Sequence, residues 1–327
     1  MSERPALDAE WALVGDIGGT NARFALVQPG TTDLTQVKVL ACQDYSNLDG
    51  AVKAYLDQSG IGGVTKACLA FACPVQGDRI KLTNAHWAFE KREMQTRLGL
   101  TVFKVVNDFT AMALGVMHVA PEQRFQVGGD TARATAPALV IGPGTGLGVS
   151  GLVPTPQGLL PLATEGGHVD LVATDTLELA ILGHLRTQFG RVSAERVLCG
   201  EGLENIYRAL QAEQGLTSSP LRAAEITAAA LAQADPLATA TLDLFCAWLG
   251  RVAGNAALTL GALGGVYVCG GIIPRISEFF RHSRFRACFE EKGRMSAYLK
   301  PVPVWVVTDN YTGLKGAAAA LDNAVVT

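Results

Sequence analysis

The sequence carries few charged residues and no run of basic ones. Asp, Glu, Lys and Arg make up 17% of the 327 residues, and the formal net charge is −3. Binding to nucleic acid depends on Lys and Arg side chains that neutralise phosphates. We therefore expect no nucleic acid among the partners of this protein. The low charge, with 49% hydrophobic residues, also excludes a long disordered polar tract.

The cysteines lack the spacing of a metal site or of a disulfide framework. There are seven of them, an odd number, and no pair has the spacing C-x-x-C. No group of cysteines and histidines has zinc-site spacing. Several cysteines lie in apolar runs, where a free thiol behaves as a small hydrophobe. This usage favours a reducing compartment.

No uninterrupted hydrophobic segment is long enough to cross a membrane. The longest weakly charged stretch, 247–272, contains Arg251 and Asn255 and is cut by Gly264 and Gly265. We interpret it as a helix followed by a strand. The first ten residues contain no apolar core of a signal peptide. We therefore expect no membrane partner and a cytoplasmic location.

Strand and helix patterns alternate along the chain, which predicts an α/β protein. The length suggests about two domains of ordinary size. Capping patterns at 46–49 and 175–178 predict two helix starts. In the second helix, Leu177, Ile181 and Leu185 are predicted to form the buried face, and the last helix is expected to open at Gly316. The predicted strands are 11–14, 22–27, 66–72, 102–106, 138–141, 149–153, a run from 266 into the glycines at 270–271, and 303–308.

Two glycine-rich turns, each between two predicted strands, are the most prominent local features. The first is Gly15-Asp-Ile-Gly-Gly-Thr-Asn21, and the second is Gly142-Pro-Gly-Thr-Gly-Leu-Gly148. Consecutive backbone N–H groups in such turns form a nest for an anion. One turn alone would indicate an ordinary hairpin, but two suit a triphosphate, and the repeat indicates two related halves. Neither turn has the Walker pattern or a clear dinucleotide-binding fingerprint.

Polar residues at three other places could carry chemistry. Asn107-Asp108 follows an apolar strand, at the end where open α/β sheets bind ligands, and a carboxylate there can accept a hydroxyl proton. A plain Asn-Asp turn is the alternative. Glu165 and His168, with two glycines between them, could face one polar ligand, although a solvated loop is the alternative and a metal site would need a third ligand. Glu195 also suits the first turn of a helix for electrostatic reasons alone.

Two further features concern the binding of a nucleotide. Asp16, in the first glycine turn, would repel a phosphate unless a bound Mg²⁺ reversed the local sign. Gly270-Gly271 follows a buried strand and would let a flat ring or a backbone come close, although tight strand–helix packing requires the same small residues.

Together, these segments resemble the bacterial glucokinases of the hexokinase–actin–Hsp70 superfamily. The two glycine turns, the first continued through Ala22-Arg23, resemble its two phosphate loops, and Gly270-Gly271 resembles its adenosine segment. Three further segments resemble the sugar site and run in family order between about residues 11 and 316: Asn107-Asp108-Phe-Thr, Glu165-Gly-Gly-His168-Val-Asp and Ser193-Ala-Glu195-Arg-Val. Pro143 is a departure, at a loop position where other members can carry a smaller residue. The cysteine-rich zinc segment of the related repressor/ORF/kinase family does not follow His168.

The resemblance implies two actin-like (ribonuclease H-like) α/β domains flanking a cleft: a small domain of 1–118 plus 309–327 and a large domain of 119–308. It implies transfer of the γ-phosphoryl group of ATP to the 6-hydroxyl of glucose, with Asp108 as general base, in a homodimeric enzyme. The sugar hydroxyls would be held by Asn107, Asp108, Glu165, His168 and Glu195. ATP would be bound by Gly15, Asp16, Ile17, Gly18, Gly19, Thr20, Asn21, Gly144, Thr145, Gly146, Gly270 and Gly271, and Mg²⁺ by Asp16 through water.

Three alternatives stay open. The acceptor could be another hexose, such as mannose, fructose or an amino sugar. A sugar-responsive regulator on the same fold would need a helix-turn-helix extension, for which the stretch of about ten residues before the first strand is too short. A polymerising or chaperone ATPase would have no need for the polar set at 107–108, 165–168 and 195.

Overall fold

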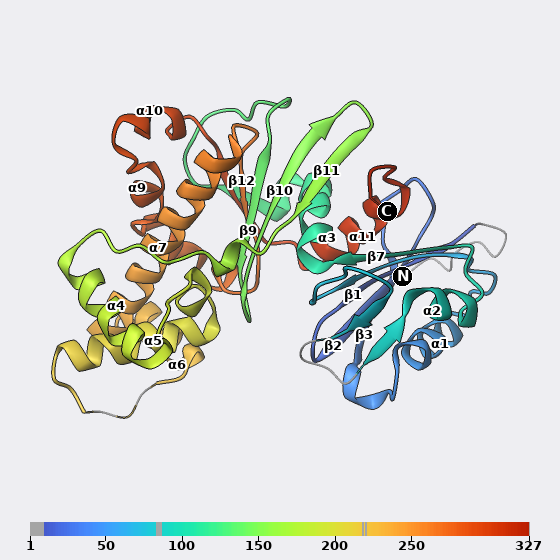
Figure 1. Ribbon diagram of the computed structural model, residues 1–327, viewed down its shortest axis with the longest axis horizontal. Coiled ribbons are helices and arrows are strands. Elements are labelled where there is room, and N and C mark those ends of the chain that lie inside the picture. Colours follow the sequence, from blue (N-terminus) through green and yellow to red (C-terminus); the bar gives the residue numbers. More distant parts are fainter. Residues whose placement is uncertain (1–9, 83–86, 218, 220, 327) are drawn as a thin grey trace. The chain divides into compact units, whose positions relative to one another are not determined.

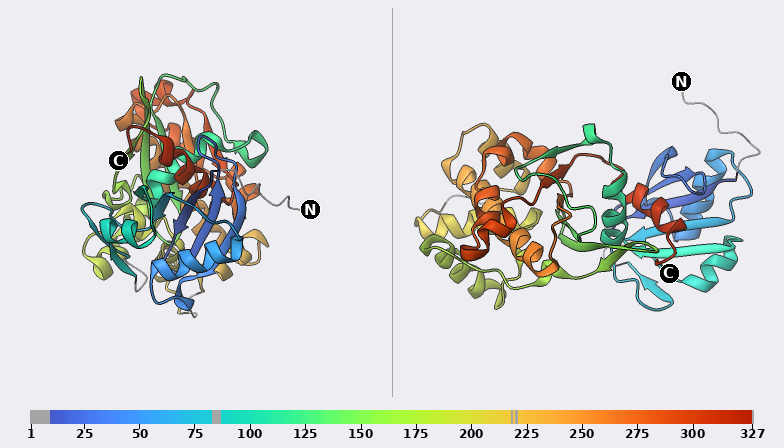
Figure 2. Two further views of the ribbon diagram at one scale, coloured as in Figure 1. Left: turned by 90° about the vertical axis from the view of Figure 1, so that its right-hand side faces the viewer. Right: turned by 90° about the horizontal axis from the view of Figure 1, so that it is seen from above.

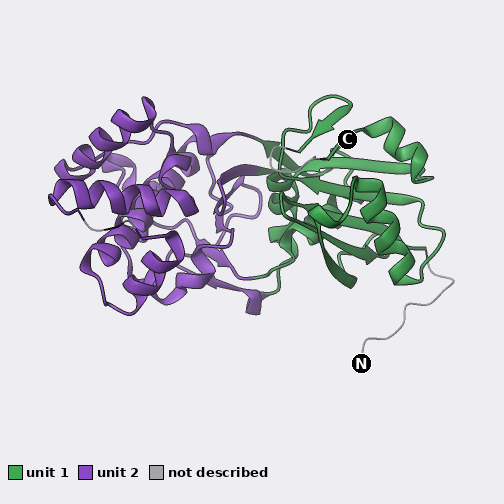
Figure 3. Ribbon diagram, turned by 90° about the horizontal axis from the view of Figure 1, so that it is seen from below, with its two compact units in different colours: residues 1–120, 152–163, 309–327 green, residues 121–151, 164–308 purple. Residues whose placement is uncertain are grey.

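The computed structural model describes residues 10–82, 87–217, 219 and 221–326. The expectation of no signal peptide concerns a segment that lies almost wholly outside the described residues. The chain divides into two compact units, coloured separately in Figure 3. Unit 1 comprises residues 1–120, 152–163 and 309–327, and unit 2 comprises residues 121–151 and 164–308. The stretch 152–163 is thus grouped with unit 1, whereas the domains expected from the sequence keep it with 119–308.

Unit 1 is built on a five-stranded mixed sheet with the strand order β3-β2-β1-β4-β7 (Figure 1). β1 pairs antiparallel with β2, which confirms the hairpin predicted around the first glycine turn. β1 and β4 are parallel, and so are β4 and β7. The strands of this unit are β1 (Ala12–Ile17), β2 (Asn21–Val27), β3 (Thr35–Ala41), β4 (Lys66–Phe71), β7 (Val102–Asn107), and the separate hairpin of β5 (Arg79–Lys81) and β6 (Ala88–Glu90).

Helices cover both faces of this sheet. α1 (Leu48–Ser59) and α2 (Lys91–Arg97) bury Tyr55 and Met94 against strand residues that include Leu13, Ile17 and Phe24. α3 (Asp108–Gly115) and α11 (Thr312–Asp322, red in Figure 2) pack on the other face, against β4 and β7. The sheet of unit 1 is therefore buried on both sides, which explains the continuous apolar run of β4.

α3 and α11 cross with their backbones in contact. A Cβ atom on Gly115 would collide with the carbonyl oxygen of Thr312, and one on Gly316 would collide with that of Ala111. Both obstacles are backbone atoms, so neither can move aside as a side chain could. The glycines therefore set the spacing of the two helices. α11 begins at Thr312, and the expectation that the last helix opens at Gly316 is wrong by one turn.

A half-buried lysine ties the end of α11 to the sheet. Nζ of Lys104, on β7, donates hydrogen bonds to the carbonyl oxygens of Ala320 (3.0 Å), Asn323 (2.9 Å) and Val326 (2.7 Å). Ala320 lies in the last turn of α11, and a cation near the C-terminal end of a helix complements the helix dipole. Lys104 therefore holds the C-terminal segment against unit 1.

Unit 2 contains most of a second mixed sheet, with the strand order β11-β10-β9-β12-β13-β8. β9, β12 and β13 are parallel neighbours, and the second glycine turn joins β9 to β10. The first five strands thus repeat the order of the unit 1 sheet, which confirms the two related halves predicted from the glycine turns. The strands are β8 (Arg124–Gln126), β9 (Ala138–Pro143), β10 (Leu147–Thr155), β11 (Gly158–Ala163), β12 (Val266–Val268) and β13 (Val304–Val307); β11 and the end of β10 are grouped with unit 1.

The core of unit 2 surrounds one long helix, α7 (Pro236–Leu260), which packs against β9 and against the helices α5 (Gly200–Glu213), α6 (Ala223–Leu231), α9 (Phe285–Glu290) and α10 (Ser296–Leu299). Asp235 accepts the Leu237 N–H at its start, and Gly261, in the left-handed region at φ 62°, ends it. The remaining helices are α4 (Thr176–Phe189) and α8 (Ser277–His282).

The buried face of α4 differs from the prediction. Asp175 caps the helix as expected, by accepting the Glu178 N–H at 2.8 Å. Leu177, however, is 43% exposed, and Glu178 is fully buried beside Ile181 and Leu185. Glu178 faces inward because its carboxylate pairs with Arg251 of α7 at 2.5 Å. A charged residue was not expected in the core, and its partner lies far away in the sequence.

All seven cysteines are free and buried. Burial raises the pKa of every one of these thiols. This agrees with their interpretation as small hydrophobic residues. Among the described residues, no helix is both long and apolar enough to span a membrane.

Candidate active site

In unit 1, the first glycine turn and the Asn107-Asp108 segment leave the sheet at the same edge. The register aligns Ile17 of β1 with Phe71 of β4, and Phe71 with Asn107 of β7. The ends of β1 and β7 are therefore level and two strand spacings apart, roughly 10 Å. The structure thus brings together two segments that the sequence separates by nearly ninety residues.

The first turn is closed by backbone hydrogen bonds. The Gly18 N–H donates to the Asn21 carbonyl at 3.0 Å, and the Cys42 N–H donates to the Thr20 carbonyl at 2.8 Å. Thr20 is exposed at the tip of the turn, and Thr145 is exposed at the corresponding place in the second turn. Each turn thus presents a hydroxyl beside its backbone N–H groups, as a phosphate site requires.

Asp16 lies under the first turn, on β1. Its carboxylate is 24% exposed and lies 3.4 Å from the guanidinium of Arg23 on β2. Burial raises the pKa of Asp16, and Arg23 opposes this only in part. A Cβ on Gly313, in the first turn of α11, would lie 3.2 Å from the Asp16 side chain, so the start of that helix adjoins the carboxylate. A poorly solvated carboxylate of this kind gains from a nearby cation.

Asn107 and Asp108 form the start of α3. Oδ1 of Asn107 accepts the N–H groups of Phe109 (2.9 Å) and Thr110 (3.3 Å), and its Nδ2 donates to the Cys73 carbonyl at 3.3 Å. Asn107 is therefore the N-cap of α3, a structural role that the sequence analysis did not assign to it. Asp108 is half-buried in the first helical turn, and its Oδ1 accepts the Phe109 N–H at 2.9 Å. The cap fixes where the Asp108 carboxylate lies.

In unit 2, the second glycine turn packs against two other segments. The Gly144 carbonyl accepts the N–H of Gly200, the first residue of α5, at 2.9 Å. Gly270, at φ 87°, lies so close to the Pro143 carbonyl that a Cβ would collide with it. Gly270 therefore adjoins the second turn, in keeping with the predicted nucleotide site. Gly271 has open space where its Cβ would be.

The three predicted sugar residues of unit 2 meet at one place. His168, at the end of a 3₁₀ turn (Gly166–His168), has Nε2 4.0 Å from Glu165 and Nδ1 3.8 Å from Glu195. Glu195 lies on a second 3₁₀ turn (Ala194–Arg196), whose Ala194 N–H donates to the Val169 carbonyl. Two carboxylates and an imidazole around one point can accept and donate hydrogen bonds to several hydroxyls.

Sequence reasoning missed the groups that support these side chains. Arg191 donates to the His168 carbonyl at 2.8 Å and pairs with Asp170 at 2.6 Å. The Leu147 N–H donates to Glu195 at 2.9 Å, and Gly313 makes room for Asp16. A backbone N–H carries no sequence signal, whereas Arg191 could have been suspected as a cation two residues before Ser193.

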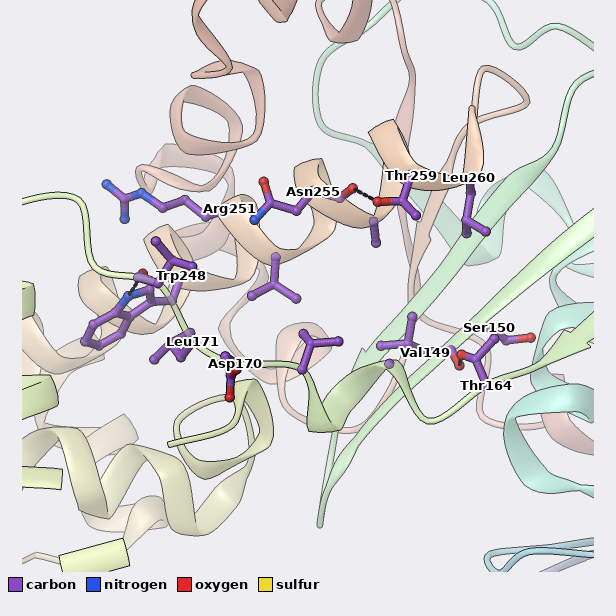
Figure 4. A pocket seen from close by; sticks show the side chains of 15 residues that line it. Val149, Ser150, Thr164, Asp170, Leu171, Trp248, Arg251, Asn255, Thr259 and Leu260 are labelled. Atoms are coloured by element: carbon purple, nitrogen blue, oxygen red, sulfur yellow. Dashed lines mark hydrogen bonds between the residues drawn. The ribbon is translucent and has the colours of Figure 1, made fainter. Parts of the chain in front are cut away.

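Unit 2 contains a cavity of about 390 Å³ (Figure 4), whose lining includes Gly166 and Val169, the chain neighbours of Glu165 and His168. It lies between α7 and the segment 164–172, and most of its wall is apolar, with Leu171 and Trp248 among the contributors. The described residues that line the cavity do not include Glu165, His168 or Glu195. Its apolar walls suit neither a phosphate nor a sugar, so we do not place the chemistry there.

Comparison with known proteins gives one consistent result. The glucokinase family model matches residues 13–324. The chain is 61% identical over 315 residues to the glucokinase of Hahella chejuensis, covering 96% of this chain and 98% of the relative. It is 50% identical over 324 residues to the glucokinase of Neisseria meningitidis, covering 99% and 98%.

Solved structures agree with these relatives. The glucokinase from an Antarctic psychrotroph is 37% identical, with a TM-score of 0.89, and the match covers 96% of this chain and 99% of that one. A ROK family glucokinase from Streptomyces griseus, solved with glucose and AMPPNP, is 19% identical at a TM-score of 0.59, with 95% and 99% covered, and this shows likeness of fold alone. The family match spans nearly the whole chain and both sets of site residues, and the chain therefore belongs to the glucokinase family.

Proposed function

We propose that this protein transfers the γ-phosphoryl group of ATP to the 6-hydroxyl of glucose, giving glucose 6-phosphate and ADP. Membership of the glucokinase family supports the reaction class. The structural observation that carries the proposal is the register of Ile17, Phe71 and Asn107, which puts a glycine turn and a carboxylate at one sheet edge. A phosphate nest beside an acidic side chain is what transfer to an alcohol requires.

We further propose that the units correspond to two actin-like (ribonuclease H-like) domains flanking a cleft, a small one of 1–118 plus 309–327 and a large one of 119–308. The repeated strand order supports this, because each sheet contains one hairpin, β1–β2 or β9–β10, whose two strands are joined by a glycine turn. The division of the chain into compact units differs from this proposal at 152–163, which it groups with the first unit.

The proposed nucleotide site consists of the two turns and Gly270-Gly271. Backbone N–H groups of 15–21 and 144–146 would bind the phosphates, with Thr20 and Thr145 adding hydroxyl donors. Glucose and AMPPNP were both bound in the Streptomyces griseus enzyme of similar fold, and AMPPNP is an analogue of ATP. We propose the same pair of sites here.

Asp16 fits a role toward Mg²⁺. No group of three or more acidic, His or Cys side chains within the described residues could hold a metal alone. Mg²⁺ is usually held by one or two carboxylates together with substrate phosphates and water, so one desolvated carboxylate is sufficient. When bound, Mg²⁺ would neutralise phosphate charge, and Asp16 would orient it through water.

Asp108 is proposed as the general base. At the start of α3 its carboxylate is held by the Phe109 N–H, and the Asn107 cap fixes its place relative to β7. It would accept the proton of the sugar 6-hydroxyl as the oxygen attacks phosphorus. Asn107, Glu165, His168 and Glu195 would hold the other hydroxyls. Phosphoryl transfer requires little covalent work from the protein, so this positioning is the main contribution.

Substitution of the proposed base tests the assignment. We expect Asp108→Asn to lower kcat by about 10²–10⁴, the usual contribution of general acid–base catalysis, with glucose binding retained. Purified protein with Mg²⁺, ATP and glucose, with ADP release followed by a coupled assay, gives the measurement. Near-normal turnover of a folded Asp108→Asn variant would contradict the role.

The same assay with a panel of hexoses separates glucose from mannose, fructose and amino sugars as acceptors. A buried site matched to its hydroxyls discriminates by about 10⁴–10⁵ between substrates.

We also propose that the protein is a cytoplasmic homodimer. Light scattering after size-exclusion chromatography measures the mass, and a monomer would contradict that proposal.

A further inference from the structure

We propose that Glu195 couples the sugar site to the second phosphate loop, and that Gly146 is a glycine in order to leave space for the Glu195 carboxylate. This inference rests on the proposed function, because it assigns sugar and phosphate binding to the two segments. It adds a positioning role for Glu195, which the family resemblance gives only as a sugar contact.

The two oxygens of Glu195 face different partners. Oε1 lies 3.8 Å from Nδ1 of His168, on the sugar side. Oε2 accepts the Leu147 N–H at 2.9 Å, on the loop side. One carboxylate, two-thirds buried, therefore touches both segments. A shift of either segment changes where this carboxylate lies for the other.

Gly146 lies directly against the same oxygen. A Cβ at this position would be 2.5 Å from Oε2 of Glu195 and 3.3 Å from its carboxyl carbon. The backbone of Gly146 is not in the left-handed region, so any residue could adopt its conformation. A side chain at 146 would therefore displace the Glu195 carboxylate, which is the free end of a flexible side chain.

Gly144 of the same loop provides the contrast. A Cβ there would have no neighbour within 4 Å, and its φ angle is also ordinary. The two glycines thus differ in one respect, namely what lies beside them. An alanine at 144 adds a methyl group to the loop alone, whereas an alanine at 146 also displaces Glu195.

The sugar segment is packed on the same strand that begins at this loop. A Cβ on Gly167 would collide with the Leu147 carbonyl, and one on Gly166 would lie 2.9 Å from Val149. Thr164 donates its hydroxyl to the Val149 carbonyl at 2.7 Å. The segment 164–168 is therefore in direct contact with β10, the strand whose Leu147 N–H binds Glu195.

Such an arrangement makes binding at the two sites interdependent. A sugar that fixes Glu195 also fixes the Leu147 N–H and the end of the loop. By thermodynamic linkage, phosphate binding that fixes the loop then favours the carboxylate position that the sugar needs. We infer positive coupling between glucose and nucleotide in the binding equilibria.

The test compares Gly146→Ala with Gly144→Ala by calorimetry of glucose binding, first without nucleotide. We expect Gly146→Ala to weaken glucose binding about tenfold, because a charge-assisted hydrogen bond is lost and the carboxylate moves. Gly144→Ala is expected to alter the ATP KM while the glucose Kd stays within twofold of wild type. Repeating the titrations with AMPPNP is expected to tighten glucose binding in wild type and less so in Gly146→Ala.

The outcomes separate this inference from the proposed function. If wild type binds no glucose, the proposed function fails. If wild type binds glucose and Gly146→Ala binds it equally well, the coupling through Glu195 is refuted while the function stands. Glu195→Ala adds a second check because it removes the acceptor of the Leu147 N–H: it is expected to raise both the glucose and the ATP KM, and an effect on glucose alone would refute the link to the loop.

Discussion

Adding one methyl group where α3 crosses α11 is expected to affect both stability and catalysis. In Gly316→Ala, the new Cβ meets the backbone carbonyl of Ala111, so the helices must separate. Overpacking of this kind costs about 3 kcal/mol, and the better helix propensity of alanine returns about 1 kcal/mol. We therefore expect a net loss of about 2 kcal/mol in the free energy of unfolding.

The same separation reaches the proposed catalytic groups. α3 begins at Asp108, and the first turn of α11 adjoins the Asp16 side chain at Gly313. A misplacement of about 1 Å between reacting groups can cost about 10² in kcat. We expect Gly316→Ala to lose activity at temperatures where it is still folded.

Urea unfolding followed by circular dichroism gives the free energy of unfolding, and the coupled ADP assay gives kcat. Gly183→Ala is the matched control, because Gly183 lies within α4 and a Cβ there meets nothing within 4 Å. That control is expected to gain up to about 1 kcal/mol from helix propensity alone. A Gly316→Ala variant that matches wild type in both unfolding midpoint and kcat would refute the reasoning.

Three further substitutions, at Asp16, Arg251 and Glu178, test the charges described above. Because burial raises the pKa of Asp16, ionisation of this group costs the folded state more than the unfolded state. Asp16→Asn is therefore expected to be less active yet more stable than wild type at pH 7. The gain in stability is absent below about pH 3.8, grows up to the raised pKa of Asp16 and is constant above it. Thermal unfolding at pH 3 and pH 7 measures this gain, and a loss of stability at pH 7 would contradict it. Arg251→Met leaves the buried Glu178 carboxylate without its cation and is expected to cost about 3–5 kcal/mol in urea unfolding. Adding Glu178→Gln is expected to recover most of that loss, and a double variant no more stable than Arg251→Met would count against the pairing.

Both glycine turns and the strands β1, β2, β4, β7, β9, β10, β12 and β13 could be predicted from the sequence because their signals are local. The strands β3, β5, β6, β8 and β11 were not among those predicted. Apolar runs and glycines decide where each strand stops, whatever the rest of the chain does. The buried face of α4 could not be predicted in this way. Glu178 is buried through a cation on another helix, and no pattern within 176–189 indicates that partner.

The candidate site shows the same division. The residue types at 107–108, 165–168 and 195 pointed to hydroxyl chemistry, and the structure gathers the last two groups around His168. That Asn107 caps α3 could not be predicted, since the Asn-Asp pair fits a turn equally well. Nor could the sequence distinguish Gly144 from Gly146, because only the fold brings Glu195 beside one of them.

The seven buried thiols offer a natural label for following how the molecule opens. Three of them, Cys42, Cys68 and Cys73, belong to unit 1, and the four others belong to unit 2. A folded molecule hides all seven from an alkylating reagent, and an unfolded unit exposes its whole set at once. Mass spectrometry of protein alkylated across a denaturant series would therefore follow the unfolding of each unit separately. Unit 1 would gain three adducts and unit 2 four, without any engineered probe.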